Sequence, residues 1–162
     1  MQEIAVTTCE YKKARSPSIL SSGWMGPCIS VGVISGEEGY MSHDVSEPVY
    51  LERLLQDVKD RADLQFYVVG GGLSSDETRF DFWVERRKKF RQVVLDMISD
   101  AGYGNALRVV RWGRLDTGTS LKLVLPEGGA EFIEIYDSSA EVYDRRKAFL
   151  PSLSYFPFPL HQ

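Results

Sequence analysis

The order of the secondary-structure signals predicts an α+β fold, with a mixed or antiparallel sheet and two helices packed on it. Short apolar runs rich in β-branched residues predict several strands early in the chain. Two segments with helical spacing follow, separated by a strand, and the chain then returns to strands. Strands and helices that are grouped in this way, without strict alternation, are typical of α+β proteins.

The strands are predicted from short apolar runs bounded by glycine, proline or serine. Ile29 to Ile34 is β-branched at nearly every apolar position, which indicates a buried strand. A second short strand ends at His43, and the turn between the two is rich in glycine and glutamate, so an antiparallel hairpin is expected. The other predicted strands are Glu3 to Thr8, Ile19 to Ser22, Leu64 to Val69, Leu107 to Val110, Ser120 to Leu125 and Glu131 to Tyr136. Cys9, which follows the first of them, is expected to pack as part of that strand.

Two helices are predicted from apolar residues at helical spacing. The first begins near Ser46, with Pro48 suited to its first turn, and runs to about Asp60. The second and longest runs from Phe82 to Ala101 and is followed by a glycine that suits a C-cap. Its basic cluster is expected to face solvent, and its inward residues are expected to be Val84, Val93, Val94, Met97 and Ile98.

Composition and charge exclude several classes of protein. The chain has 162 residues, a net charge of -4 and no basic stripe beyond residues 86–89, which argues against a nucleic-acid partner. No apolar run approaches the roughly 18 residues that span a bilayer, so no membrane insertion is expected. The N-terminus lacks a signal-peptide pattern, and two cysteines are too few for a disulfide scaffold. These features together predict a cytoplasmic protein.

One cysteine and one histidine are the candidate catalytic residues. Because a hairpin brings the far ends of its strands together, Cys28 can lie beside His43, and a thiol beside an imidazole suffices for cysteine nucleophilic catalysis. Ser22 could orient the imidazole, and backbone N–H groups near Cys28 could stabilise an oxyanion. The cysteines and histidines form no close ligand pairs, so no metal is expected, and since the sequence has no nucleotide-binding motif no other cofactor is expected. Alternatively, Cys28 is a small buried hydrophobic residue.

Glycines flank this candidate site. Gly23 and Gly26 lie in the loop before Cys28, and Gly70-Gly71-Gly72 ends a strand. Such a run indicates an unusual backbone path or a close backbone approach. We expect these glycines to leave room for a substrate side chain, although the run is also compatible with an ordinary loop.

Two segments resemble the motifs of the CheD family of chemoreceptor glutamine deamidases. The family has Thr-x-Gly-x-Gly-Ser-Cys-Val-x-Val, and here the segment reads Ser22-Gly23-Trp24-Met25-Gly26-Pro27-Cys28-Ile29-Ser30-Val31. The next strand of the family ends in Gly-x-Met-x-His, and here it reads Gly39-Tyr40-Met41-Ser42-His43. The order of the later strands and helix also follows the family, so the resemblance covers roughly Ile4 to Ile135.

The resemblance implies a fold and a reaction. The fold would be a sandwich of two β layers with helices outside, in a domain of residues 1–136. Residues 137–162 go beyond the family core, and because they show no helical or strand period we expect them to pack on the domain as an irregular extension. Cys28 would be the nucleophile and His43 the general base and acid, and Ser22 stands where the family has threonine. The reaction would convert protein glutamine to glutamate without a cofactor, and the implied partners are methyl-accepting chemoreceptors and a CheC-type phosphatase. Toxin deamidases that resemble cytotoxic necrotizing factor share the same Cys–His core.

Three departures from the family pattern keep alternatives open. Pro27 replaces the serine before the cysteine and removes a backbone N–H from the loop. Ser22 replaces threonine but keeps the hydroxyl, and Phe82-Trp83-Val84-Glu85-Arg86 replaces a helix start that bears asparagine and glycine. The alternatives are a catalytically silent binding module on the same fold, and a Cys–His amidase or protease acting on another amide.

Overall fold

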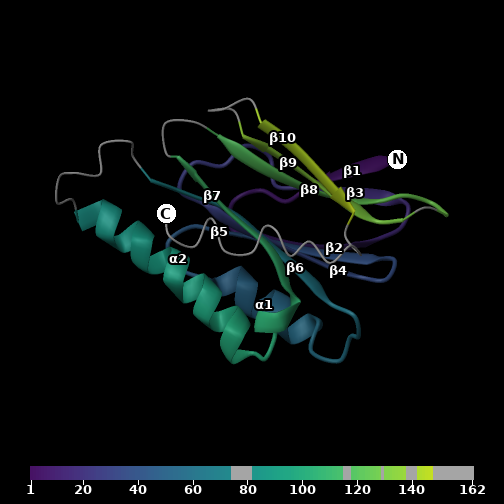
Figure 1. Cartoon of the computed structure of the whole chain (residues 1–162), viewed down its shortest axis with the longest axis horizontal. Coiled ribbons are helices and arrows are strands. Elements are labelled where there is room, and N and C mark those ends of the chain that lie inside the picture. Colours follow the sequence, from purple (N-terminus) through teal and green to yellow (C-terminus); the bar gives the residue numbers. More distant parts are fainter. Residues whose placement is uncertain (74–81, 115–117, 129, 138–141, 148–162) are drawn as a thin grey trace.

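Two β-sheets pack face to face, and both helices lie on the outer face of one sheet (Figure 1). The computed structural model describes residues 1–73, 82–114, 118–128, 130–137 and 142–147. This arrangement confirms the predicted α+β class and the sandwich with its helices outside.

Sheet A is built from the two ends of the chain. Its strands are β1 (Gln2–Ala5), β3 (Ser18–Ser21), β8 (Thr119–Leu125), β9 (Phe132–Asp137) and β10 (Val142–Lys147), in the order β1-β3-β8-β9-β10. The pair β1 and β3 is parallel, and the other neighbours are antiparallel.

Sheet B holds the predicted hairpin at its centre. Its strands are β2 (Glu10–Arg15), β5 (Glu38–Asp44), β4 (Ile29–Ser35), β6 (Gln65–Leu73) and β7 (Leu107–Arg114), in the order β2-β5-β4-β6-β7. Only β6 and β7 pair in parallel within this sheet. The antiparallel pairing of β4 with β5 confirms the hairpin that the sequence predicted.

The two helices cover sheet B. Helix α1 (Val49–Asp57) contacts β5 and β2, and helix α2 (Phe82–Asp100) contacts β6. A short 3₁₀ helix, η1 (Gly104–Ala106), leads into β7. Within the ranges given above, no helix has both the length and the apolar character needed to cross a membrane.

The alternation of side chains along β4 divides the core into two layers. Ile29, Val31 and Val33 face the helices, whereas Ser30 and Gly32 lie on the opposite side of the strand and face sheet A. A Cβ atom on Gly32 would lie 2.9 Å from a methyl group of Leu123 in sheet A, so glycine allows the two sheets to approach closely. Each aliphatic side chain buried in these layers contributes about 1.5–3 kcal/mol to folding.

Two strands were not predicted. These strands are β2 and β10. Because β10 covers residues 142–147, the expectation that the extension after residue 136 is irregular is wrong for these residues. The backbone of β10 pairs with the edge of β9, and an edge strand needs hydrogen-bonding partners more than an alternating apolar pattern. The remainder of the extension, residues 138–141 and 148–162, lies outside the described residues.

Candidate active site

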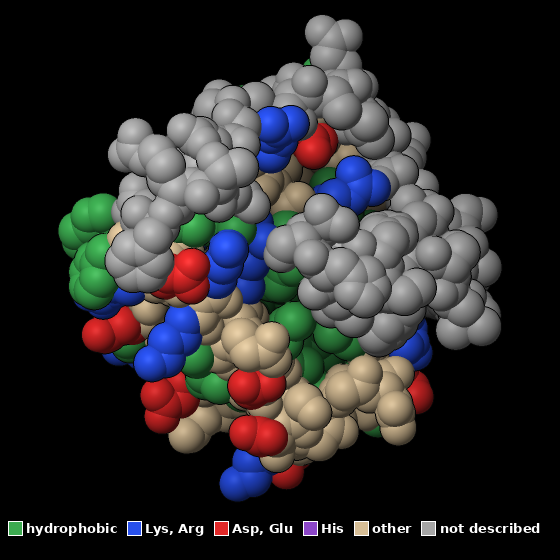
Figure 2. All heavy atoms as spheres, turned by 60° about the vertical axis from the view of Figure 1, so that its left-hand side comes forward, with side chains coloured by type: hydrophobic (Ala, Val, Ile, Leu, Met, Phe, Trp, Pro, Cys, Tyr) green, Lys and Arg blue, Asp and Glu red, His purple; other side chains and the backbone are tan. Residues whose placement is uncertain are grey.

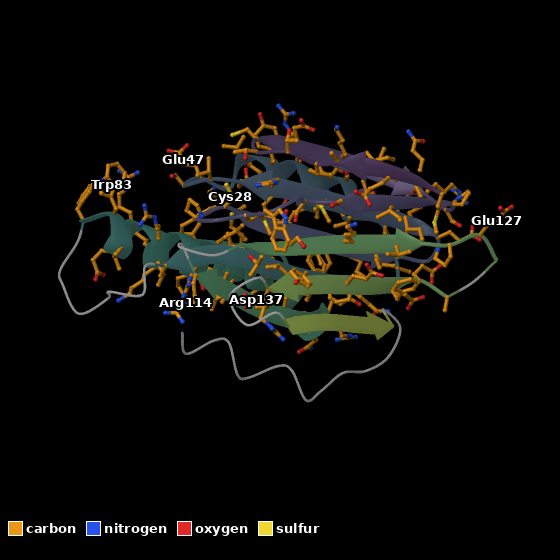
Figure 3. All side chains as sticks on the ribbon, turned by 90° about the horizontal axis from the view of Figure 1, so that it is seen from above. Cys28, Glu47, Trp83, Arg114, Glu127 and Asp137 are labelled. Carbon is orange, nitrogen blue, oxygen red and sulfur yellow. The ribbon has the colours of Figure 1, made fainter. Side chains whose placement is uncertain are left out.

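Cys28 ends the loop that carries the chain from sheet A to sheet B. The loop leaves β3 and enters β4, and backbone hydrogen bonds tie it to both sheets. Met25 exchanges two of these bonds with Thr119 in β8, with N–O distances of 2.8 and 3.2 Å. Gly71 donates from β6 to the carbonyl oxygen of Cys28 over 2.7 Å. The loop therefore holds Cys28 on an anchored backbone, at the opposite end of the sandwich from Glu127 (Figure 3).

The glycines of β6 allow this anchoring, and they do not form the substrate space that we expected. Gly70 has a φ of +112°, and a Cβ atom on it would overlap the carbonyl oxygen of Cys28. Gly72 donates to the carbonyl oxygen of Gly26 over 2.8 Å, and a Cβ atom on it would lie 2.6 Å from that oxygen. Gly71 is buried between them. The expectation for Gly70-Gly71-Gly72 is therefore wrong, because atoms of neighbouring segments fill the space.

The two loop glycines also differ from the expectation. Gly26 is partly buried, and its carbonyl oxygen is engaged with β6. Gly23 is exposed and lines an open hollow of about 500 Å³ on the outer face of sheet A, together with Trp24 and Tyr136. The candidate catalytic residues do not line this hollow, so the structure does not bring Gly23 together with them.

His43 is buried on β5 with its protonation pattern set by a backbone neighbour. Its Nδ1 lies 2.8 Å from the carbonyl oxygen of Val6, just after β1. A carbonyl oxygen only accepts, so Nδ1 carries the hydrogen and Nε2 keeps a free lone pair in the neutral ring. Burial lowers the pKa of His43 below its usual value, which favours that neutral form. Among the described residues, Nε2 has no hydrogen-bond partner. This nitrogen is therefore a buried base that faces no competing donor.

Cys28 and His43 lie on the same face of sheet B. Ser30 pairs directly with His43 across β4 and β5, and Cys28 lies two residues before Ser30, so Cys28 and His43 are diagonal neighbours. Such neighbours lie about 7–8 Å apart between Cα atoms, and their side chains can meet. Cys28 packs against the layer between the two sheets, which also contains Val6. In the described part of the chain, neither side chain hydrogen-bonds to the other.

The thiol of Cys28 is in its neutral form in this arrangement. Burial raises its pKa, and the nearby Cys9 and Asp44 raise it further, whereas the hydroxyl of Thr8 opposes the shift. The Oγ1 atom of Thr8 lies 3.9 Å from Sγ. Together with the lowered pKa of His43, this describes a neutral thiol and a neutral imidazole, and not the preformed ion pair that a Cys–His pair suggests.

The hydroxyl of Ser22 does not hydrogen-bond to the imidazole of His43. Its hydroxyl donates to the carbonyl oxygen of Gly23 over 2.8 Å and accepts from the N–H of Leu121 over 2.9 Å. The orienting contact that we expected from Ser22 comes instead from the carbonyl oxygen of Val6. Ser22 joins the start of the loop to β8, because its backbone N–H also donates to Leu121.

Three residues near the site were not predicted. Val6 acts through its backbone, for which a sequence carries no signal. Thr8 lies beside the thiol, and Asp44 caps α1 by accepting from the N–H groups of Tyr50 and Leu51 at 2.9 and 2.8 Å. Asp44 lies four residues before Pro48, the N-cap of α1, so the preference for aspartate at the N-cap does not point to it. Cys9, expected in the first strand, is instead exposed beyond the end of β1 with a φ of +62°.

A small cavity lies on the helix side of the same end of sheet B. It has a volume of about 150 Å³, and its lining includes Pro27, directly before Cys28, and Val45, directly after Asp44. The rest of the lining comes from Ser46 and from α2. Within the described ranges, no group of three or more His, Cys, Asp or Glu side chains is arranged to hold a metal ion.

No family model matches the sequence, and no curated protein matches it. Support for a function therefore comes from the site itself and from the two motifs that resemble those of the CheD family.

Proposed function

We propose that the protein is a cysteine-dependent deamidase that hydrolyses glutamine side chains of a partner protein. The observation that carries this proposal is the buried Nε2 of His43, which keeps a free lone pair on the face of the sheet that it shares with Cys28. A base with its other nitrogen fixed by an acceptor is the arrangement that activates a neighbouring nucleophile.

The reaction begins with Cys28 as a neutral thiol. Its Sγ attacks the carbonyl carbon of the glutamine amide while Nε2 of His43 takes the thiol proton. This requires Sγ to approach Nε2, and catalytic contacts of this kind often tighten only when substrate binds. The N–H of Cys28 donates to no backbone carbonyl oxygen among the described residues and would donate to the oxyanion.

The second half of the reaction returns the enzyme to its starting state. His43 gives its proton to the departing amide nitrogen, so ammonia leaves and a thioester joins Cys28 to the substrate. His43 then takes a proton from water, which attacks the thioester. The products are a glutamate side chain and the free thiol, and no cofactor enters the balance.

The resemblance to the CheD family suggests the substrate. Methyl-accepting chemoreceptors are the first proteins to test, and a CheC-type phosphatase is a second partner that the resemblance implies. Incubation of the protein with cytoplasmic chemoreceptor fragments from the same organism, followed by peptide mass spectrometry, should locate glutamine residues converted to glutamate. The Cys28→Ala variant is the control. Equal glutamine content with both proteins across the receptors would reject the chemoreceptor substrate.

A second candidate is a catalytically silent binding module. It is favoured by the raised pKa of Cys28 and by the lack of a hydrogen bond between Cys28 and His43. If neither receptor fragments nor general amide substrates release ammonia in the presence of the protein, this candidate replaces the deamidase.

A further inference from the structure

The first turns of α2 present an aromatic and basic surface to solvent. Phe82 and Trp83 are 58% and 57% exposed, which makes them unusual among the large hydrophobic side chains of the described residues. The guanidinium carbon of Arg86 lies 5.5 and 5.7 Å from the two ring centroids, so it stacks over both rings. Adjacent exposed aromatic side chains are costly in water and commonly mark an interaction site.

This surface continues into the small cavity beside the candidate active site. Trp83, Arg86, Arg87 and Phe90 of α2 supply one wall, and the residue directly before Cys28 lies in the opposite wall. A volume of about 150 Å³ is comparable with cavities that hold a benzene-sized group, so one apolar side chain fits. Figure 3 shows Trp83 and Cys28 toward the same end of the molecule.

This surface is positively charged, whereas the chain as a whole is negatively charged. The chain has a net charge of -4, whereas residues 86–89 are all basic. Lys88 lies 3.9 Å from Glu85, but Arg86 and Arg87 form no ion pair with any residue of the described ranges. Figure 2, turned toward the end where α2 begins, shows Lys and Arg side chains next to hydrophobic ones. The surface therefore complements an acidic segment that also carries an apolar side chain.

We propose that the start of α2 docks an acidic segment of the protein substrate. An apolar side chain of the segment enters the cavity, and flanking carboxylates pair with Arg86 and Arg87. The glutamine then reaches Cys28 past Pro27. This docking proposal rests on the proposed deamidase function. It adds the chemistry by which the protein would select its substrate.

The test measures binding with the Cys28→Ala protein, so that turnover does not affect the result. The probe is a short fluorescent peptide with one glutamine, one leucine and several glutamates, and its comparison peptide has serine in place of each glutamate. Fluorescence anisotropy should show about tenfold tighter binding of the acidic peptide. Arg86→Glu/Arg87→Glu should weaken that binding about tenfold or more, and Trp83→Ala should weaken it to a similar extent.

A matched control lies on the same helix. Lys88→Glu/Lys89→Glu changes the net charge by the same amount but alters no residue of the cavity lining, so it should weaken binding less than about threefold at physiological salt. Equal binding of the two peptides, or equal losses in the two double variants, would overturn the proposal. A third outcome would also overturn it: the protein binds neither peptide but sediments with phosphatidylserine vesicles, and of the two double variants only Arg86→Glu/Arg87→Glu abolishes this sedimentation. That result would assign the surface to a membrane.

Failure of the docking proposal can be distinguished from failure of the proposed deamidase function. If the acidic peptide binds as expected but no glutamine is converted by the wild-type protein, the deamidase falls and the docking surface stands. If the wild-type protein converts glutamine and Arg86→Glu/Arg87→Glu changes neither peptide binding nor conversion, the docking proposal falls alone.

Discussion

The basic nitrogen of His43 depends on one backbone oxygen. The carbonyl of Val6 holds Nδ1–H at 2.8 Å and leaves Nε2 free, and burial keeps the ring neutral. A backbone acceptor fixes the tautomer without adding a negative charge that would raise the pKa of the imidazole. The ring therefore remains a base even in mildly acidic solution, which suits a partner whose thiol is itself protonated.

The lowered pKa of His43 predicts a pH dependence of stability. The folded protein binds the proton less readily than the unfolded chain, in which histidine has a pKa of about 6.5. Stability should therefore fall as the pH drops through that value toward the folded pKa, and the loss should then level off. Between about pH 7.5 and pH 5, the free energy of unfolding of the wild-type protein should therefore fall by more than that of His43→Gln. Urea unfolding at each pH measures this, and parallel losses in both proteins would contradict the assignment.

Ser22 should affect stability and leave the imidazole unchanged. Ser22→Ala removes the acceptor for the buried N–H of Leu121, which should cost about 1–2 kcal/mol in the free energy of unfolding. Ser22→Thr keeps the hydroxyl and serves as the matched control. The pKa of His43, followed by NMR titration, should be the same in both variants. A clear shift in Ser22→Ala alone would mean that Ser22 orients the ring after all.

Among the elements, β6 determines where the loop with Cys28 can lie. Gly70→Ala should cost about 2 kcal/mol or more, because the backbone is left-handed there and the new methyl group meets the carbonyl oxygen of Cys28. Gly36→Ala is the control: its φ is +58°, but nothing lies within 4 Å of its Cβ position, so it carries only the conformational cost of about 1 kcal/mol. Both are measured by chemical denaturation. Equal losses would show that the contact with the loop contributes nothing.

The elements that the sequence predicted are those with strong local patterns. The hairpin of β4 and β5 and the two helices follow from apolar spacing and turn residues, and the structure confirms them. Strand β2 was missed because Glu10-Tyr11-Lys12-Lys13-Ala14-Arg15 is mostly polar, and charged residues are common on edge strands. The backbone oxygen of Val6 and the contacts of Gly70 were beyond prediction, because both depend on how distant segments pack. The sequence indicated an unusual path at the glycine run but not the neighbour that requires it.

At the scale of the molecule, the candidate site lies where the chain crosses between the two sheets. One crossing leads from β1 to β2 and contains Val6 and Cys9, and the other leads from β3 to β4 and contains Cys28. The first crossing holds His43 at two points: the carbonyl oxygen of Val6 binds its ring, and the N–H of Cys9 donates to its carbonyl oxygen over 2.8 Å. The site therefore forms only when both sheets are packed, which links its chemistry to the fold of the whole sandwich.

The most direct test is the conversion of glutamine to glutamate in receptor fragments by four matched proteins, followed by peptide mass spectrometry. Cys9→Ser should convert glutamine at the wild-type rate, because Cys9 is exposed and its thiol takes no part in the proposed steps. Cys28→Ala and His43→Ala should each lower the rate by about 100-fold or more, since the nucleophile and its base act as a unit. Conversion by Cys28→Ala at the wild-type rate, or its loss in Cys9→Ser alone, would contradict the assignment of Cys28 as the nucleophile.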